Sequence, residues 1–128
     1  MDSRVLFVGA GGFIGSVLRY WLSSYVQQVS KSVSFPYGTL AVNLIGCLVI
    51  GVLSQLADSR GVFTPEARAF VFIGILGGFT TFSSFGNETI NLFRGSENIE
   101  GIANVIAHIV LGLGMVWLGR LTAAIIWK

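Results

Sequence analysis

The side chains best suited to bind a ligand lie between Gly74 and Asn87, where hydroxyls, phenyl rings and glycines occur without any charged residue. The hydroxyls and rings belong to Phe79, Thr80, Thr81, Phe82, Ser83, Ser84 and Phe85. Hydroxyl protons and the electropositive edges of phenyl rings can contact a small anion without a fixed positive charge. These residue types and their spacing favour an anion path. The alternative is that the rings only pack against lipid or against other helices.

The same stretch is a poor continuous helix. Gly77 and Gly78 each cost about 1 kcal/mol of helix propensity relative to alanine, and the β-branched pair Thr80 and Thr81 adds to this cost. Serine and threonine hydroxyls also compete for backbone hydrogen bonds. We therefore expect a break in the helix between Gly77 and Ser83. Because hydrocarbon tolerates broken backbone only where protein buries it or where it lines a polar path, the break predicts a functional site.

Two other segments carry polar side chains along one helical face. Thr39, Asn43 and Gly46 follow one another at helical spacing, and so do Asn104 and His108. An unpaired amide is costly in hydrocarbon, so Asn43 either bonds a neighbouring helix or presents its NH₂ group to a polar path. We expect His108 to be neutral and bonded to another helix, with a titrating gate as the alternative. A metal site at His108 is not expected, because the chain has no second histidine.

The spacing of charges indicates which elements position these side chains. Between Arg4 and Lys31 the only charged residue is Arg19, Lys31 and Asp58 enclose 26 uncharged residues, and two later windows contain 19 each. Each window can hold a membrane-spanning helix of about 20 residues. We expect four such helices, at Val5–Val26, Tyr37–Leu56, Ala67–Phe93 and Ile102–Trp127. The connections are short, so residues 1–128 are expected to form a single all-α transmembrane domain with both termini on one side.

Composition excludes several classes of protein. The chain is 53% hydrophobic and only 11% charged, whereas about a quarter of the residues in a soluble domain are charged. Residence in a lipid bilayer follows. A net charge of +2 is too small to indicate a nucleic-acid partner. The single cysteine, Cys47, excludes an intrachain disulfide and a multi-cysteine zinc site.

A glycine-rich segment, Gly9-Ala-Gly-Gly-Phe-Ile-Gly15, imitates a dinucleotide-binding turn. That turn requires a preceding strand and an acidic residue about 20 positions later, but no acidic residue occurs between Asp2 and Asp58. We instead expect Gly11 and Gly15 to form a face on which two helices approach closely. An enzyme that binds a nucleotide is therefore not expected.

The basic residues give only a weak indication of orientation. Five Lys or Arg residues fall on the side of the termini and three on the other, Arg19 among them. Since such residues in short loops determine which side is cytoplasmic, the chain can insert both ways and assemble as an antiparallel dimer. A single orientation with a modest bias is the alternative. Arg19 is either an anchor at the membrane surface or a cation that attracts anions to a vestibule.

None of the expected spans offers a carboxylate within the membrane, since Glu88 only closes the uncharged window of the third span. Cation pathways and proton-coupled transporters usually carry buried acids, so neutral donors again favour an anion path. A small multidrug-type exporter would need a glutamate in the first span, which is absent.

At this point the sequence resembles a known family. Gly77-Gly-Phe-Thr-Thr-Phe-Ser-Ser-Phe85 is similar to the signature of the Fluc (CrcB-type) fluoride channels. The glycine-rich first span ending in Arg19-Tyr20 and the segment Gly38-Thr-Leu-Ala-Val-Asn-Leu-Ile-Gly46 match as well. The resemblance covers essentially the whole chain. It implies a dual-topology antiparallel homodimer with two separate fluoride pores.

The resemblance also implies roles for individual residues. Fluoride would pass Asn43, Phe82 and Phe85, with hydroxyls of a polar track and the vestibule cation nearby; these are Thr39, Thr81, Ser84 and Arg19. Backbone carbonyls at Gly77 and Thr80 would hold a structural Na⁺ ion at the dimer interface. A physical reason supports the ion, since two inverted copies of a broken helix bring four hard oxygen donors together.

The fourth span departs from the family pattern, because many relatives carry tyrosine and serine where this chain has Asn104 and His108. Both residues are possible pore-lining residues. The sequence as a whole predicts a fluoride channel of the inner (plasma) membrane, with passive export and no catalysis. The alternative is a helical membrane scaffold that transports nothing, in which the glycines and polar faces serve assembly alone.

Overall fold

The computed structural model describes residues 2–128, and these fold into helices without any strand. Four helical segments are long and apolar enough to cross a membrane. In order they are α1 (Arg4–Ser30); α2 (Tyr37–Arg60); a third segment of α3 (Pro65–Arg68), η1 (Ala69–Leu76), α4 (Gly77–Phe79) and α5 (Phe82–Arg94); and a fourth of α6 (Asn98–Ile106), η2 (Ala107–Leu111) and α7 (Gly112–Ile126). The predicted all-α membrane fold with four spans is confirmed.

The helices are longer than hydropathy alone predicts. The first helix was expected to end at Val26, but it continues to Ser30 and ends where Lys31 adopts a left-handed conformation with φ of 54°. The second helix likewise runs past Leu56 and ends before Gly61, whose φ is 60°. Apolar residues mark the part of a helix that lies in lipid, whereas a residue in the left-handed conformation determines where the helix ends. The connecting loops are correspondingly shorter than predicted.

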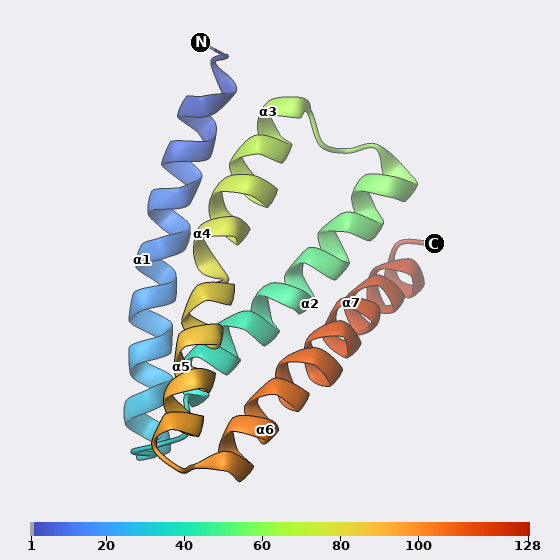
Figure 1. Cartoon of the computed structure of the whole chain (residues 1–128). Helices are drawn as coiled ribbons and strands as arrows, with labels where there is room; N and C mark the ends of the chain where they lie inside the picture. Colours follow the sequence, from blue (N-terminus) through green and yellow to red (C-terminus); the bar gives the residue numbers. More distant parts are fainter. Residues whose placement is uncertain (1) are drawn as a thin grey trace.

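Glycines allow the helices to approach one another closely. α1 packs along η1 and α4, side by side in Figure 1. A Cβ atom on Gly11 would overlap the carbonyl oxygen of Phe70, and one on Gly15 would overlap that of Ile75. The dinucleotide-like segment therefore lies inside a continuous helix and serves helix packing, as expected.

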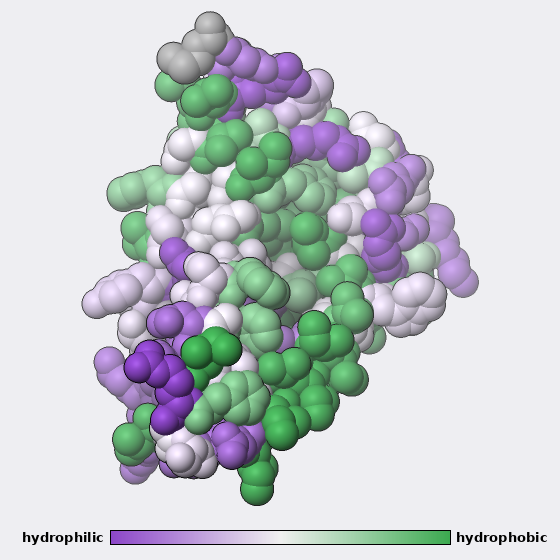
Figure 2. Space-filling view, in the orientation of Figure 1, coloured by the Kyte–Doolittle hydropathy of each residue, from purple (hydrophilic) through white to green (hydrophobic). Residues whose placement is uncertain are grey.

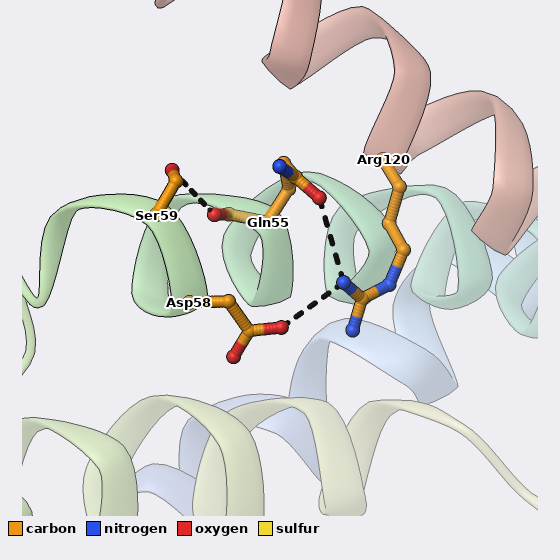
Figure 3. A network of polar contacts seen from close by, with 4 residues as sticks. All are labelled: Gln55, Asp58, Ser59 and Arg120. Carbon is orange, nitrogen blue, oxygen red and sulfur yellow. Dashed lines mark hydrogen bonds and ion pairs between the residues drawn. The ribbon is translucent and has the colours of Figure 1, made fainter.

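The second pair of helices uses the same device. α2 packs along α7, and a Cβ atom on Gly51 would overlap the carbonyl oxygen of Val116. At the end of this pair, the Arg120 guanidinium donates to Asp58 Oδ2 at 3.1 Å and to Gln55 Oε1 at 3.5 Å (Figure 3). Arg60 donates to the carbonyl oxygen of Trp127 at 2.8 Å, which ties α2 to the end of the chain.

Hydrophobic side chains cover much of the outer surface, as a bilayer requires. Figure 2 shows a mainly hydrophobic surface at the lower right, over α6 and α7, while hydrophilic residues gather toward the ends of the helices. Leu113 and Trp117 on α7 are both exposed. The molecule therefore has the surface of a multi-pass membrane protein.

Candidate functional site

The third helical segment contains two residues in extended conformation. Thr80 has φ and ψ of −94° and 155°, and Thr81 has −149° and 109°, between the end of α4 and the start of α5. The Thr81 hydroxyl accepts the backbone N–H of Ser84 at 3.1 Å and so caps α5. These two residues lie within the stretch whose glycines and β-branched residues predict interrupted winding.

Asn43 on α2 bonds both backbone groups of Thr81. Its Oδ1 accepts the Thr81 N–H at 2.8 Å, and its Nδ2 donates to the Thr81 carbonyl oxygen at 3.1 Å. The opposite orientation of the amide would place donor against donor and acceptor against acceptor, so the contacts themselves determine which atom is oxygen. Asn43 thus does what a neighbouring strand would do, and satisfies backbone that leaves the helix.

Two carbonyl groups lose their usual helical partners at this point. In a continuous helix the Gly77 carbonyl would accept the Thr81 N–H, but that N–H donates to Asn43. The Thr80 carbonyl would accept the Ser84 N–H, but that N–H donates to the Thr81 hydroxyl. The chemistry of these two oxygens, neutral and hard, fits a small cation such as Na⁺.

The fourth segment supplies an imidazole next to Asn43. His108 Nε2 lies 3.0 Å from Asn43 Nδ2, and His108 Nδ1 lies 3.0 Å from the carbonyl oxygen of Asn104. The Asn104 side chain itself is fully buried, and its Nδ2 donates to the Thr89 hydroxyl at 2.9 Å. The polar face predicted for this segment therefore bonds two helices, α2 through His108 and α5 through Asn104.

The two phenylalanines after the extended residues differ in their surroundings. Phe85 is buried, with its ring centroid 4.2 Å from that of His108, and it meets Phe82 edge-on at 5.4 Å. Phe82 is 81% exposed in the single chain. The Phe85 ring is thus fixed by packing, whereas the Phe82 ring is available to a second molecule or to a ligand.

The candidate residues fall into two cavities that share one residue. One, of about 380 Å³, is lined by Asn43, Gly77, Thr80, Thr81, Phe82, Phe85 and His108 among others. The other, of about 220 Å³, is lined by Arg19, Tyr20, Ser23, Thr39, Val42, Thr81, Ser84 and Glu88. Thr81 lies in both. Thr81 therefore belongs to the wall of both cavities, and Asn104 is not among the lining residues of either.

Two expectations about the third segment need correction. Helical spacing predicts Thr80 and Ser84 on one polar stripe, but the extended residues between them place Thr80 in the larger cavity and Ser84 in the smaller. The spans were also expected to offer no carboxylate within the membrane, with Glu88 only closing the uncharged window. Glu88 instead lies near the middle of α5, where its Oε1 accepts the Thr39 hydroxyl at 2.8 Å.

Glu88 is a charged site residue to which the sequence argument assigned no role. Its Oε2 is buried without a hydrogen-bond partner, and the side chain also lines an outer cavity of about 680 Å³. Its position one turn after Ser84 was the available signal. The smaller cavity consequently has a cation, Arg19, and a carboxylate, Glu88, among its lining residues.

Comparison with known proteins places this geometry in context. A family model described as CrcB-like protein, Camphor Resistance (CrcB), matches residues 6–120. The chain is 48% identical to the fluoride-specific ion channel FluC of Methylobacillus flagellatus over 91% of each protein. It is 45% identical to FluC of Elusimicrobium minutum, over 93% of this chain and 92% of the relative. For FluC 1 of Methanosarcina acetivorans the identity is 40%, over 93% and 89% respectively.

Proposed function

The chain belongs to the CrcB-like protein family, and from this premise we propose that it is a fluoride channel of the plasma membrane. It is not an enzyme, and fluoride passes without coupling to another reaction. Passive export protects a cell that fluoride enters as the neutral acid. The relatives named above are fluoride-specific ion channels by name, which supports the assignment of the ion.

One observation supports the route of the ion most directly. The outer cavity shares Thr39 and Glu88 with the smaller cavity, and the smaller cavity shares Thr81 with the larger one. Three neighbouring cavities therefore lie in a series with shared wall residues, from the hydroxyls of Thr39, Thr81 and Ser84 toward Asn43 and the phenylalanines. We infer that fluoride follows this series and exchanges its water for hydroxyl and amide protons and for ring edges.

The larger cavity could hold an anion although no charged side chain lines it. The residues that line it include no charged side chain. The smaller cavity next to it is lined by both Arg19 and Glu88, so the cation there offsets the repulsion of an anion by the carboxylate. Fluoride is small and strongly hydrated, so closely spaced neutral donors can replace its water while excluding larger halides by size.

We propose that the functional unit is an antiparallel homodimer with two pores. Gly77 is exposed in the single chain, and its carbonyl lacks the partner that a regular helix provides. Polar backbone of this kind is not stable against hydrocarbon, so another protein surface must cover it. A second, inverted copy would cover it, would enclose the exposed Phe82 ring, and would bring two sets of Gly77 and Thr80 carbonyls to one Na⁺ ion. The ion would supply a fixed positive charge between the two pores.

Fluoride efflux from liposomes tests the function. Purified protein in vesicles loaded with fluoride should release it to a fluoride electrode once an ionophore balances the charge, and chloride-loaded vesicles should release little. A scaffold that transports nothing would leave the fluoride inside. Labelling tests the inverted pair: with Cys47→Ala and Lys128→Cys, an impermeant maleimide should reach about half of the termini from each side. Labelling from one side alone would contradict dual topology.

A further inference from the structure

The imidazole of His108 has a defined protonation pattern in this fold. Its Nδ1 faces the Asn104 carbonyl oxygen at 3.0 Å. A carbonyl oxygen only accepts, so Nδ1 carries the proton. In the neutral ring Nε2 is then an acceptor, and it lies 3.0 Å from Asn43 Nδ2, which can only donate. The two contacts together are compatible with a single tautomer.

We propose that His108 is a positioning residue, whose unprotonated Nε2 takes one amide proton of Asn43 and thereby holds the rest of that amide on the extended backbone of Thr81. Asn43 has two amide protons and one oxygen. One proton goes to the Thr81 carbonyl oxygen, the oxygen takes the Thr81 N–H, and the second proton goes to His108. The chain from Asn104 through His108 to Asn43 fixes the amide in rotation.

Among the residues that the structure describes, no other titratable group near the contact between His108 and Asn43 is charged, so the charge at this contact depends on the imidazole alone. In the described chain, the one other titratable side chain lining the cavity with His108 is the Cys47 thiol on α2. The packed helices carry charged side chains as well, but none of them lines this cavity: Asp58 and Arg60 on α2, Glu88 and Arg94 on α5, Glu100 on α6 and Arg120 on α7. Phe85 covers the ring with its centroid 4.2 Å away. No carboxylate is therefore placed to stabilise a protonated His108.

Protonation of the ring would reverse the contact. A proton on Nε2 would face the donor Nδ2 of Asn43, and the bond would become a repulsion between two donors. Asn43 would then turn away from Thr81, and the backbone of Thr81, which lines both cavities, would lose its partner. The inference rests on the proposed function for its flux readout, since loss of this geometry should close the route for fluoride.

The chain has one histidine, so ¹⁵N-labelled histidine in the full-length protein in lipid gives the resonances of His108 alone. We expect a neutral ring with Nδ1 protonated and Nε2 unprotonated at pH 7.5. A ring protonated at Nε2 would overturn the proposal. This measurement does not depend on fluoride transport, so absence of wild-type flux would contradict the proposed function and leave the test of His108 intact.

Fluoride flux and the protonated fraction of His108 should follow the same curve between about pH 8 and pH 5.5, after subtraction of the leak from protein-free vesicles. His108→Gln supplies an acceptor that does not titrate, so its flux should be independent of pH. His108→Ala should show, at every pH, about a tenth of the flux that the wild type has at pH 8, because a donor of Asn43 is left unpaired. Leu113→Ala, an exposed position on α7, is the matched control. A ring that becomes protonated without loss of flux, or equal flux in the Gln and Ala variants, would overturn the proposal.

Discussion

The side chain of Asn43 and the backbone of Thr81 form a closed pair, in which one amide accepts the N–H at 2.8 Å and donates to the carbonyl oxygen at 3.1 Å. The two residues are 38 positions apart and belong to different membrane-spanning segments. A single side chain on α2 therefore satisfies both backbone groups of Thr81 where the third segment leaves its regular winding.

Replacement of Asn43 should affect both flux and stability. Asn43→Leu leaves the Thr81 N–H and carbonyl without a partner, and each unpaired buried group costs about 1–3 kcal/mol. We expect fluoride flux to fall at least about tenfold and the unfolding temperature in detergent to fall with it. Ile45→Val, an exposed position on the same helix, is the control and should leave both unchanged. Wild-type flux in Asn43→Leu would exclude Asn43 from the route.

Replacement of the two phenylalanines should distinguish an effect on fluoride transport from an effect on protein stability. Phe82→Ile and Phe85→Ile should each lower fluoride flux, because isoleucine lacks an electropositive ring edge. Phe85 also packs against His108, so its replacement should cost roughly 0.5–1.5 kcal/mol of stability, whereas Phe82→Ile should cost the single chain little. Flux by fluoride electrode and thermal unfolding on the same samples distinguish the two effects. If both variants carry fluoride normally, the rings take no part in conduction.

Helix packing can be tested with two glycines of α1. A Cβ atom at Gly15 would overlap the Ile75 carbonyl, whereas one at Gly9 would meet nothing within 4 Å. Gly15→Ala should destabilise the protein by about 1–3 kcal/mol through forced separation of the helices. Gly9→Ala should be neutral or stabilising, since alanine favours a helix by about 1 kcal/mol over glycine. Equal thermal stability of the two variants would contradict the close packing of α1 on the third segment.

The ion pair between Arg120 and Asp58 should contribute little. The two side chains are 39% and 63% exposed at a separation of 3.1 Å, and pairs exposed to this degree contribute at most about 1 kcal/mol. We expect Asp58→Asn to lower stability by less than that amount, and the difference to vanish at high salt. Chemical unfolding at low and high ionic strength measures it, and a loss that survives high salt would indicate a role beyond the charge pair.

The proposed sodium site predicts that the protein depends on this cation. Exchange of Na⁺ for N-methyl-D-glucamine should lower the unfolding temperature, with a stabilisation of about 1–3 kcal/mol when Na⁺ is well above its dissociation constant. Exchange of chloride for gluconate at constant Na⁺ is the control for a general effect of replacing one ion of the salt. Identical unfolding curves in the two cations would contradict a bound ion at the Gly77 and Thr80 carbonyls.

Much of the fold was predictable because lipid imposes simple rules. The spacing of charged residues located all four helices, and the glycines of α1 indicated a packing face rather than a nucleotide turn. The helix ends were not predictable from hydropathy, since left-handed residues such as Lys31 and Gly61 determine them. Nor does any sequence pattern indicate the π-helical winding of η1 and η2.

The sequence could suggest candidate side chains for the site but not the contacts between them. Spacing places Asn43 on a polar face, but it does not say whether the amide binds water, a ligand or another helix. Its partner in the structure, Thr81, is far away in the sequence. Glu88 appeared only as the end of an uncharged window. Its contact with Thr39 depends on the direction of α5, which in turn depends on the conformation of Thr80 and Thr81.

The extended pair Thr80–Thr81 also makes the number of residues in this region as important as their type. Each residue added to or removed from a helix rotates everything beyond it by about 100°. A deletion between Gly77 and Phe82 should therefore change the direction in which α5 presents Phe82 and Phe85, which now line the larger cavity. Proteins that share this function should therefore differ here by substitutions, and their aligned sequences should contain no gaps in this region.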